Sequence, residues 1–403
     1  MQPQILRAEL SNTKSVIRLL QAVFVLLLLV MPPLPLKANS PKTTPSNSYL
    51  MYVGTYTKGA SKGIYVYRYD IESGKSTSLG LAAETVNPSF LAADPMHRFL
   101  YAVNEVGNYK GQTSGAVSSF SIDHKSGKLT FLNEVASRGA DPCYLALDKT
   151  GKFLLVANYT SGNLAVFPIS KSGSLGESSA FVQHRGKGAN PERQEGPHAH
   201  WIETTSDNRF AIAADLGLDE LLVYNFDAAR GTLTANAPPG KAETGSGPRH
   251  LAIQPDSKFV YAVNELKSSV TTFSFNSSTG ALQAVGTVST LPQNFTGQND
   301  AAEIQLYPNG KFLYASNRGD DSIAAFSVDQ STGHLKLIGH YPTQGKTPRN
   351  FVINPTGSRL LVANEDSDNI VVFRIDSQTG RLTPTGEVIS VPSPVSILFV
   401  PMN

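Results

Sequence analysis

Histidine, arginine and glutamate side chains gather at two positions of a repeated pattern in this chain. They lie six residues before or ten residues after the centre of a repeated turn: His200, Arg249 and Arg349 before it, Glu265 and Arg318 after it. These positions vary between copies, whereas the surrounding positions are apolar and repetitive. Such residue types bind anions and transfer protons, and variable polar positions on a repeated scaffold are typical of a binding site. We therefore expect the functional site at these positions, and we expect the neighbouring residues His198, His250 and Glu303 to contribute to it.

The repeated segment is 19 residues long and recurs six times at intervals of about fifty residues. Its clearest copies cover residues 87–105, 141–159, 247–265 and 347–365. Each copy contains two short strands around a turn, and two more strands lie between copies, as at residues 268–276 and 281–290. Four strands per repeat, without helical periodicity, predict the blade of a β-propeller.

The two ends of the chain each carry a part of a further copy. Residues 393–401 match the first strand of the pattern, and residues 49–57 match the second, with two more strands over residues 63–81. The sequence thus predicts an all-β, seven-bladed β-propeller of four-stranded blades over residues 49–403. The N- and C-terminal strands are expected to share one blade and to close the ring, because closure leaves no open sheet edge.

The first strand of a propeller blade lies beside the central channel, so both positions are expected at one face of the disc. There, Arg249 would lie opposite Glu265, and Arg349 opposite Glu365. An alternative interpretation is that both pairs are cross-strand ion pairs that only fix the register.

The histidines have alternative interpretations as well. His250 is either part of the site or a core histidine with satisfied hydrogen bonds. His198 and His200 alternate on one strand and are able to bind a metal ion together, but the sequence offers no third ligand, so we expect no metal and no cofactor. Cys143 is expected to be a small buried apolar side chain.

Residues 1–48 differ from the rest of the chain. Arg7, Lys14 and Arg18 precede an apolar run over residues 19–31, and a proline-rich stretch follows. This pattern is typical of a secretory signal, and the run is short for a transmembrane helix. We expect a signal peptide or membrane anchor over residues 1–38, a linker over residues 39–48, and an exported, periplasmic or extracellular monomer. The net charge of +2 gives no indication of a nucleic-acid partner, and any membrane contact would come from an uncleaved N-terminal segment.

Several motifs carry a resemblance to one known family. They are YVGTYT at 52–57, GPHAH at 196–200, GPRHL at 247–251, VNELKSSV at 263–270, AAEIQLYPNGKFLYASNRG at 301–319 and TPRNF at 347–351. Over residues 49–401 the chain resembles the seven-bladed propeller lactonases of the bacterial 6-phosphogluconolactonase type and, more distantly, the carboxy-muconate lactonising enzyme. The resemblance implies a site built from His200, Arg249, Glu265 and Arg318, with Arg349 and Glu303. The family often has histidine where this chain has Gln305.

The resemblance implies a cofactor-free lactonase that acts on sugar-derived or acidic small-molecule lactones. In this hypothesis Glu265 is the general base, with His200 as its partner or alternative, and Arg249 stabilises the oxyanion. Arg318 and Arg349 would hold a carboxylate or phosphate. Two alternatives remain open: a cycloisomerase, and a non-catalytic exported propeller, because YAVN, LVAN and YASN resemble YVTN-type repeats.

Overall fold

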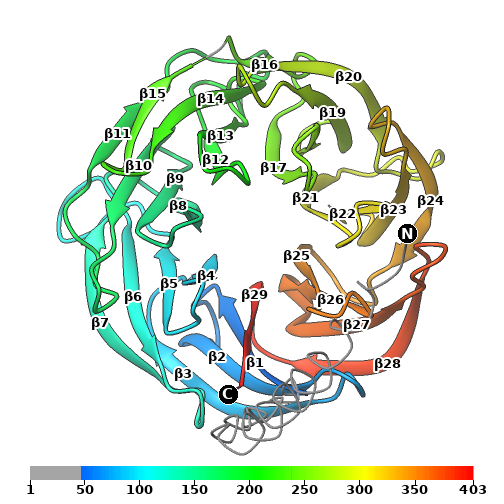
Figure 1. Cartoon of the computed structure of the whole chain (residues 1–403). Helices are drawn as coiled ribbons and strands as arrows, with labels where there is room; N and C mark the ends of the chain where they lie inside the picture. Colours follow the sequence, from blue (N-terminus) through cyan, green and yellow to red (C-terminus); the bar gives the residue numbers. More distant parts are fainter. Residues whose placement is uncertain (1–46, 237, 403) are drawn as a thin grey trace, which may run out of the picture. The chain divides into compact units, whose positions relative to one another are not determined.

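The computed structural model describes residues 47–236 and 238–402, which form seven antiparallel sheets arranged in a ring (Figure 1). In each sheet one strand lies beside the central channel: β4 (Leu91–Ala93), β8 (Pro142–Leu147), β12 (Ala199–Thr204), β17 (Pro248–Ile253), β21 (Asp300–Leu306), β25 (Pro348–Ile353) and β29 (Pro394–Pro401). The second strands are β5 (Phe99–Asn104), β9 (Phe153–Asn158), β13 (Phe210–Asp215), β18 (Phe259–Asn264), β22 (Phe312–Arg318), β26 (Arg359–Asn364) and β1 (Ser48–Thr55).

The outer half of each blade contains two further strands. The third strands are β6 (Ala116–Ile122), β10 (Asn163–Pro168), β14 (Glu220–Asp227), β19 (Ser269–Phe275), β23 (Ser322–Val328), β27 (Asn369–Ile375) and β2 (Gly63–Asp70). The fourth are β7 (Leu129–Ala136), β11 (Ala180–Gln183), β15 (Thr232–Ala235), β20 (Leu282–Ser289), β24 (Leu335–Pro342), β28 (Leu382–Ser390) and β3 (Ser76–Glu84). A short fifth strand, β16 (Gly240–Lys241), also pairs with β14. The seven-bladed, all-β prediction is therefore confirmed, with one blade extended by β16.

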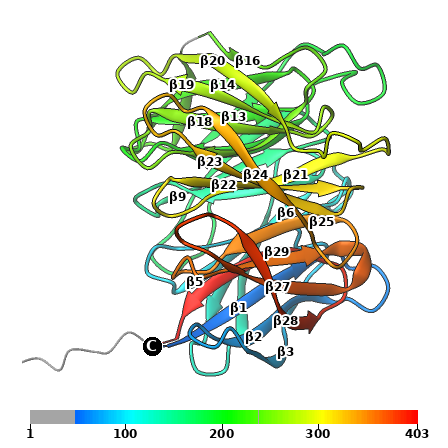
Figure 2. The same cartoon turned by 90° about the vertical axis from the view of Figure 1, so that its right-hand side faces the viewer.

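The ring is closed by the pairing of β29 with β1, as predicted. The register runs from Tyr49 opposite Pro401 to Thr55 opposite Pro394, and the two strands lie side by side in the side view (Figure 2). The first described strand begins at Ser48, so the predicted signal or anchor over residues 1–38 and nearly all of the linker over residues 39–48 lie outside the described residues. Within residues 47–236 and 238–402, no helix is long and apolar enough to span a membrane.

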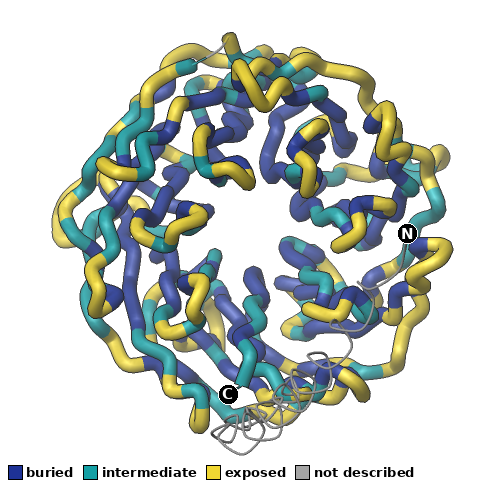
Figure 3. Tube along the Cα trace, in the orientation of Figure 1, coloured by how far each residue is buried: buried dark blue, intermediate teal, exposed yellow. Residues whose placement is uncertain are grey.

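Apolar side chains fill the spaces between neighbouring blades. Tyr101 and Val103 of one blade pack with Leu145, Leu154 and Val156 of the next, all fully buried or nearly so. Buried residues line the inner and middle strands, whereas exposed residues gather in the turns and along the outer strands (Figure 3). Each blade thus buries both faces against its neighbours, and this burial is the main stabilising contribution to the ring.

Tyrosine hydroxyls tie neighbouring blades together at several interfaces. Tyr101 Oη donates a hydrogen bond of 3.1 Å to the carbonyl oxygen of Gly173 in a turn of the next blade. The equivalent bonds run from Tyr52 to Gly127 (3.1 Å) and from Tyr314 to Gly380 (2.9 Å). Gly173 has φ +87°, and a Cβ there would lie 2.3 Å from Phe99, so this close approach requires glycine.

A β-bulge stands near the start of the channel-lining strand in most blades. The register with the second strand skips one residue at Cys143, His200, Arg249 and Arg349. In β21 the skipped residues are Ala302 and Glu303, and in β29 the skipped residue is Val395. We call these the bulge positions. A bulge leaves a residue without a partner in the strand ladder and changes the direction of its side chain. The side chains at these positions therefore depart from the alternation between the two faces of the sheet that the rest of the strand follows.

The different burial of two leucines predicts that their replacement lowers the free energy of unfolding by different amounts. Leu50 in β1 is fully buried, whereas Leu337 in β24 is 48% exposed. We expect Leu50→Ala to lower the free energy of unfolding by about 2–5 kcal/mol and Leu337→Ala to lower it by about 0.5 kcal/mol or less, as measured by urea denaturation. Equal effects of the two substitutions would contradict a stabilising role for the closing blade.

Candidate active site

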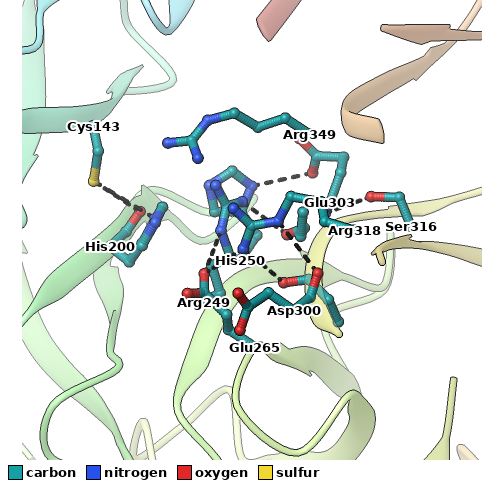
Figure 4. Close-up of polar contacts among 12 residues, drawn as sticks. Cys143, His200, Arg249, His250, Glu265, Asp300, Glu303, Ser316, Arg318 and Arg349 are labelled. Carbon is teal, nitrogen blue, oxygen red and sulfur yellow. Dashed lines mark hydrogen bonds and ion pairs between the residues drawn. The ribbon is translucent and has the colours of Figure 1, made fainter. Parts of the chain in front are cut away.

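The predicted site residues converge at one face of the ring, where the channel-lining strands begin and the second strands end (Figure 4). The bulge positions supply His200, Arg249, Glu303 and Arg349 from four different blades. Arg318 is the last residue of β22, and Glu265 follows β18 directly. His250 lies next to Arg249 on β17. The structure thus brings these seven predicted residues together, and their catalytic and binding roles stay predictions.

The Glu265 carboxylate is surrounded by three guanidinium groups. Its Oε2 lies 2.8 Å from Arg318 Nη2 and 3.0 Å from Arg249 Nε, although the latter contact is an ion pair without the alignment of a hydrogen bond. Its Oε1 accepts a hydrogen bond from Arg193 Nη2. Only 4% of Glu265 is exposed. Asp300 also lies 3.6 Å from Arg193, and the three guanidinium groups still outnumber the two carboxylates, so this cluster attracts a further anion.

Burial and neighbouring charges act in opposite directions on these groups. Burial raises the pKa of Glu265, but Arg318, Arg249 and Arg193 together lower it to about 2. Burial, with the nearby Arg318 and Arg349, lowers the pKa of Arg249 to about 10. At neutral pH the carboxylate is therefore ionised and the guanidinium is still charged.

A second charged group of residues surrounds Arg349. Its guanidinium carbon lies 5.1 Å from the centroid of the Tyr56 ring, a cation–π contact, and its Nη2 lies 3.8 Å from Glu105 Oε1. The Tyr56 hydroxyl donates to the Glu105 carboxylate at 2.9 and 3.0 Å. Glu365 is paired with Lys58 at 2.8 Å. The cross-strand pair of Arg349 with Glu365, considered from the sequence, is thus replaced by contacts to Tyr56 and Glu105, whereas the pair of Arg249 with Glu265 is present.

The imidazole of His200 is buried in the site. Its Nδ1 is 3.6 Å from Cys143 Sγ, and the ring makes an edge contact with His250 at 5.2 Å. Burial, followed by the charge of Arg249, keeps the pKa of His200 well below its usual range. His200 is therefore neutral at physiological pH. Cys143 is buried, as expected from the sequence, and burial raises the pKa of its thiol.

His250 and Glu303 form a buried pair. His250 Nδ1 lies 3.2 Å from Glu303 Oε1, and the other carboxylate oxygen accepts a hydrogen bond of 2.5 Å from Asn350 Nδ2. Burial lowers the pKa of His250 to about 4, although Glu303 opposes this shift. Within the described residues, His250 Nε2 has no hydrogen-bond partner. His250 is thus only half satisfied, which differs from an ordinary core histidine.

His198 contacts Tyr159 and Glu195. Its ring stacks on Tyr159 at 4.6 Å, and its Nε2 lies 3.2 Å from Glu195 Oε1. The same Tyr159 ring makes an edge contact with His200 at 5.4 Å, so the two histidines share this neighbour but contact it in different orientations. Across residues 47–236 and 238–402, no group of three or more His, Cys, Asp or Glu residues is arranged to hold a metal ion.

Gln305 binds backbone groups of the neighbouring blade. Its Nε2 donates to Phe351 O at 2.8 Å, and its Oε1 accepts from Ile353 N at 3.1 Å. It lines a cavity of about 350 Å³ in the central channel, together with Tyr144, Trp201, Glu303 and Asn350 among others. The glutamine thus joins β21 to β25.

Arg193 is the site residue that reasoning from the repeat did not find. It lies in the connection between β11 and β12, outside every copy of the repeated segment, so an index based on the repeat cannot reach it. Two signals were present: this connection is unusually long, and Arg193 stands three residues before the GPHAH motif in the stretch RQEGPHAH. Tyr56, from the motif YVGTYT, was also missed as a site residue.

Comparison with known proteins identifies the family. The model of the family "Lactonase, 7-bladed beta-propeller" matches residues 50–399. The chain is 39% identical to the 6-phosphogluconolactonase of Bacillus subtilis over 351 residues, which cover 87% of this chain and 98% of the relative. It is 37% identical to the 6-phosphogluconolactonase of Formosa agariphila over 310 residues, 75% of this chain and 86% of the relative.

Solved structures agree with this assignment. The periplasmic gluconolactonase of Pseudomonas aeruginosa is 36% identical, with a TM-score of 0.83 over 88% of this chain and 100% of the other. The resemblance inferred from the sequence motifs is thus confirmed, and these relatives support the predicted lactonase function. The ring of seven blades, the family match and the relatives together show that this chain belongs to the seven-bladed β-propeller lactonases.

Proposed function

We propose that the protein hydrolyses an acidic, sugar-derived lactone and that 6-phosphogluconolactone is its first candidate substrate. The observation that carries this proposal is the group of four arginines at one face, three of which surround the buried Glu265. An anionic lactone would find there both positive charge and an ionised carboxylate. The similarity to two proteins named 6-phosphogluconolactonase supports the substrate class.

Arg349 is the arginine best able to take the anionic group of the substrate. It holds Glu105 only at 3.8 Å and otherwise lies over the face of Tyr56. A guanidinium group has five N–H donors in a fixed fork, which suits bidentate binding of a carboxylate or phosphate. Arg249 and Arg318, in contrast, already donate to backbone carbonyls of β21.

The proposed reaction is the hydrolysis of a cyclic ester. Water attacks the carbonyl carbon and gives one proton to a base, while the carbonyl oxygen becomes an oxyanion that Arg249 stabilises. The ring C–O bond then breaks, and the leaving oxygen takes up that proton, so that lactone and water become a hydroxy acid. We assign the base to Glu265, with neutral His200 as the alternative. Both are weak bases in the surroundings described above.

A second candidate substrate is an unphosphorylated gluconolactone. The related structure from Pseudomonas aeruginosa is that of a periplasmic gluconolactonase. The N-terminal pattern of a secretory signal favours export of this protein as well, to a compartment where phosphorylated sugar intermediates are scarce. Export and this substrate are therefore proposed together. A non-catalytic scaffold is less well supported, because the family model and the named relatives are lactonases.

The substrate proposal is tested by a hydrolysis assay of 6-phosphogluconolactone and gluconolactone, corrected for spontaneous opening. We expect rapid hydrolysis of at least one lactone, with the hydroxy acid as product. A folded protein without activity on either substrate would favour the binding propeller, and a product isomeric with the lactone, with no water added, would favour a cycloisomerase.

Replacement of the central carboxylate tests its role in catalysis. We expect Glu265→Gln to lower kcat/KM by about 10²–10⁴-fold, because an amide cannot accept the proton from water. Glu243→Gln is the matched control, since Glu243 is 61% exposed and pairs with Lys267 on the surface. Unchanged turnover in the Glu265 variant would exclude Glu265 as the base.

The pH dependence of stability gives an independent check on Glu265. Its pKa is about 2 in the folded protein and about 4.3 in an unfolded chain. A lowered folded pKa stabilises the protein above pH 4.3, and this contribution is lost as pH falls toward 2. We therefore expect the difference in Tm between the wild type and Glu265→Gln to narrow between about pH 5 and pH 2. A constant difference would contradict the ionised, arginine-paired state.

Substitution of Arg349 tests anion binding. We expect Arg349→Gln to raise KM for the phosphorylated lactone by about 10–100-fold, as for a lost charge-assisted hydrogen bond, with a smaller effect on gluconolactone. Lys346→Gln is the control, because Lys346 is 73% exposed and binds Asp321 on the surface. Equal changes of KM for both lactones would argue against contact with the phosphate.

A further inference from the structure

We propose that Arg193 covers the Glu265 carboxylate in the free enzyme and turns to the anionic group of the substrate in the complex, which uncovers Glu265 Oε1 for the attacking water. This inference rests on the proposed lactonase function. It adds to that function a residue that the repeat does not contain and a step that couples binding of the anion to activation of the base.

The two oxygens of Glu265 are held in different ways. Oε2 contacts both Arg249 and Arg318. Among the described residues, Oε1 has Arg193 as its one charged partner. Removal of Arg193 alone would therefore open one oxygen to water and leave the other fixed, which is the arrangement that a positioned general base requires.

The three arginines also differ in how firmly they are anchored. Arg249 Nη1 donates to Ala302 O at 2.8 Å, and Arg318 Nε donates to Asp300 O at 3.2 Å. Their side chains are 2% and 14% exposed. These two arginines are built into the wall of the site by bonds to the backbone of β21, so they are poorly placed to move.

Apart from its bond to the buried Glu265, Arg193 is held by groups at the open side of the site. Its side chain is 37% exposed, and its second ion pair, 3.6 Å from Nη1 to Asp300 Oδ1, is with a carboxylate that is itself 45% exposed. Tyr159 lies within hydrogen-bonding reach as well. An anionic ligand at this face competes with these contacts, and partly exposed ion pairs are the weakest of their kind.

The loop below Arg193 is fixed, so the movement is confined to its side chain. The adjacent Gln194 is fully buried and donates to Leu216 O at 2.8 Å and to Asp219 Oδ1 at 2.7 Å. Its own Oε1 accepts from Asn190 N at 3.0 Å, and Arg193 N donates to Asn190 Oδ1 at 3.1 Å. The backbone thus stays in place while the long side chain exchanges one anion for another.

The movement of Arg193 from Glu265 to the substrate makes the Glu265 carboxylate a better base. With three guanidinium groups around it, Glu265 binds protons too weakly to be an effective base. When Arg193 leaves, the carboxylate loses one positive neighbour and becomes more basic, and Oε1 can accept the proton of the water that attacks the lactone carbonyl. The anionic group of the substrate therefore contributes to the rate as well as to binding.

The test compares Arg193→Gln with Arg185→Gln, an exposed arginine of the same connection, in the full-length protein. Kinetics are measured with 6-phosphogluconolactone and with gluconolactone, and thermal melting confirms folding. For Arg193→Gln we expect the preference for the anionic lactone, as the ratio of kcat/KM values, to fall by about 10-fold or more. We also expect the acidic limb of its pH–rate profile to move to higher pH, because Glu265 has lost a positive neighbour. Arg185→Gln should change neither quantity.

The outcomes separate this inference from the proposed function. If the wild type hydrolyses neither lactone, the proposed function itself fails. If the wild type is active, but Arg193→Gln retains the preference for the anionic lactone or leaves the acidic limb unmoved, the movement of Arg193 is refuted and the lactonase function stands. Arg193→Lys retains the charge and should restore a large part of both effects, whereas a purely structural role would show itself as a lower melting temperature in both variants.

Discussion

The pairing of β29 with β1 is the contact on which the arrangement of the other blades depends. A propeller blade is placed by its two neighbours, and the pairing from Tyr49–Pro401 to Thr55–Pro394 gives every blade a neighbour on both sides. The site draws its side chains from blades all round the ring, among them Tyr56, which follows β1, and Arg349 in β25 of the neighbouring blade. Their contact depends on β29, the strand from the other end of the chain that completes the blade of β1.

The site itself is organised by the balance of buried charges. Arginine side chains that converge on a buried place require a counter-ion, because an isolated buried charge is costly. Glu265 supplies that charge for three arginines, and Glu105 with Tyr56 supplies it for Arg349. The same pairing that permits burial also makes Glu265 a weak base in the free protein. Stability and reactivity thus place opposite demands on one carboxylate.

Much of the fold was accessible from the sequence because the repeat is a local signal. Strand pairs, turns and the partial copies at the two ends predict seven blades and their closure without knowledge of distances. The positions of His200, Arg249, Glu265 and Arg318 followed from the same index. Contacts of the non-repeated connection before β12 did not follow, so Arg193 was missed. Tyr56 was missed although it lies in the partial copy of the repeat over residues 49–57. The alternative pairing of Arg349 with Glu365 is replaced by contacts to Tyr56 and Glu105. Protonation states were equally inaccessible, because they depend on burial and on charges from several blades.

The bulge positions have a consequence for how such a ring can change. A residue in a bulge stands outside the strand ladder, so its replacement breaks no pairing between strands. In this chain the equivalent positions hold residues as different as Cys143, His200, Arg249 and Val395, within strands that keep the same register. The scaffold thereby separates the residues that hold it together from those that meet a ligand. Residues at the bulge positions can therefore be replaced one blade at a time, with little loss of stability of the ring.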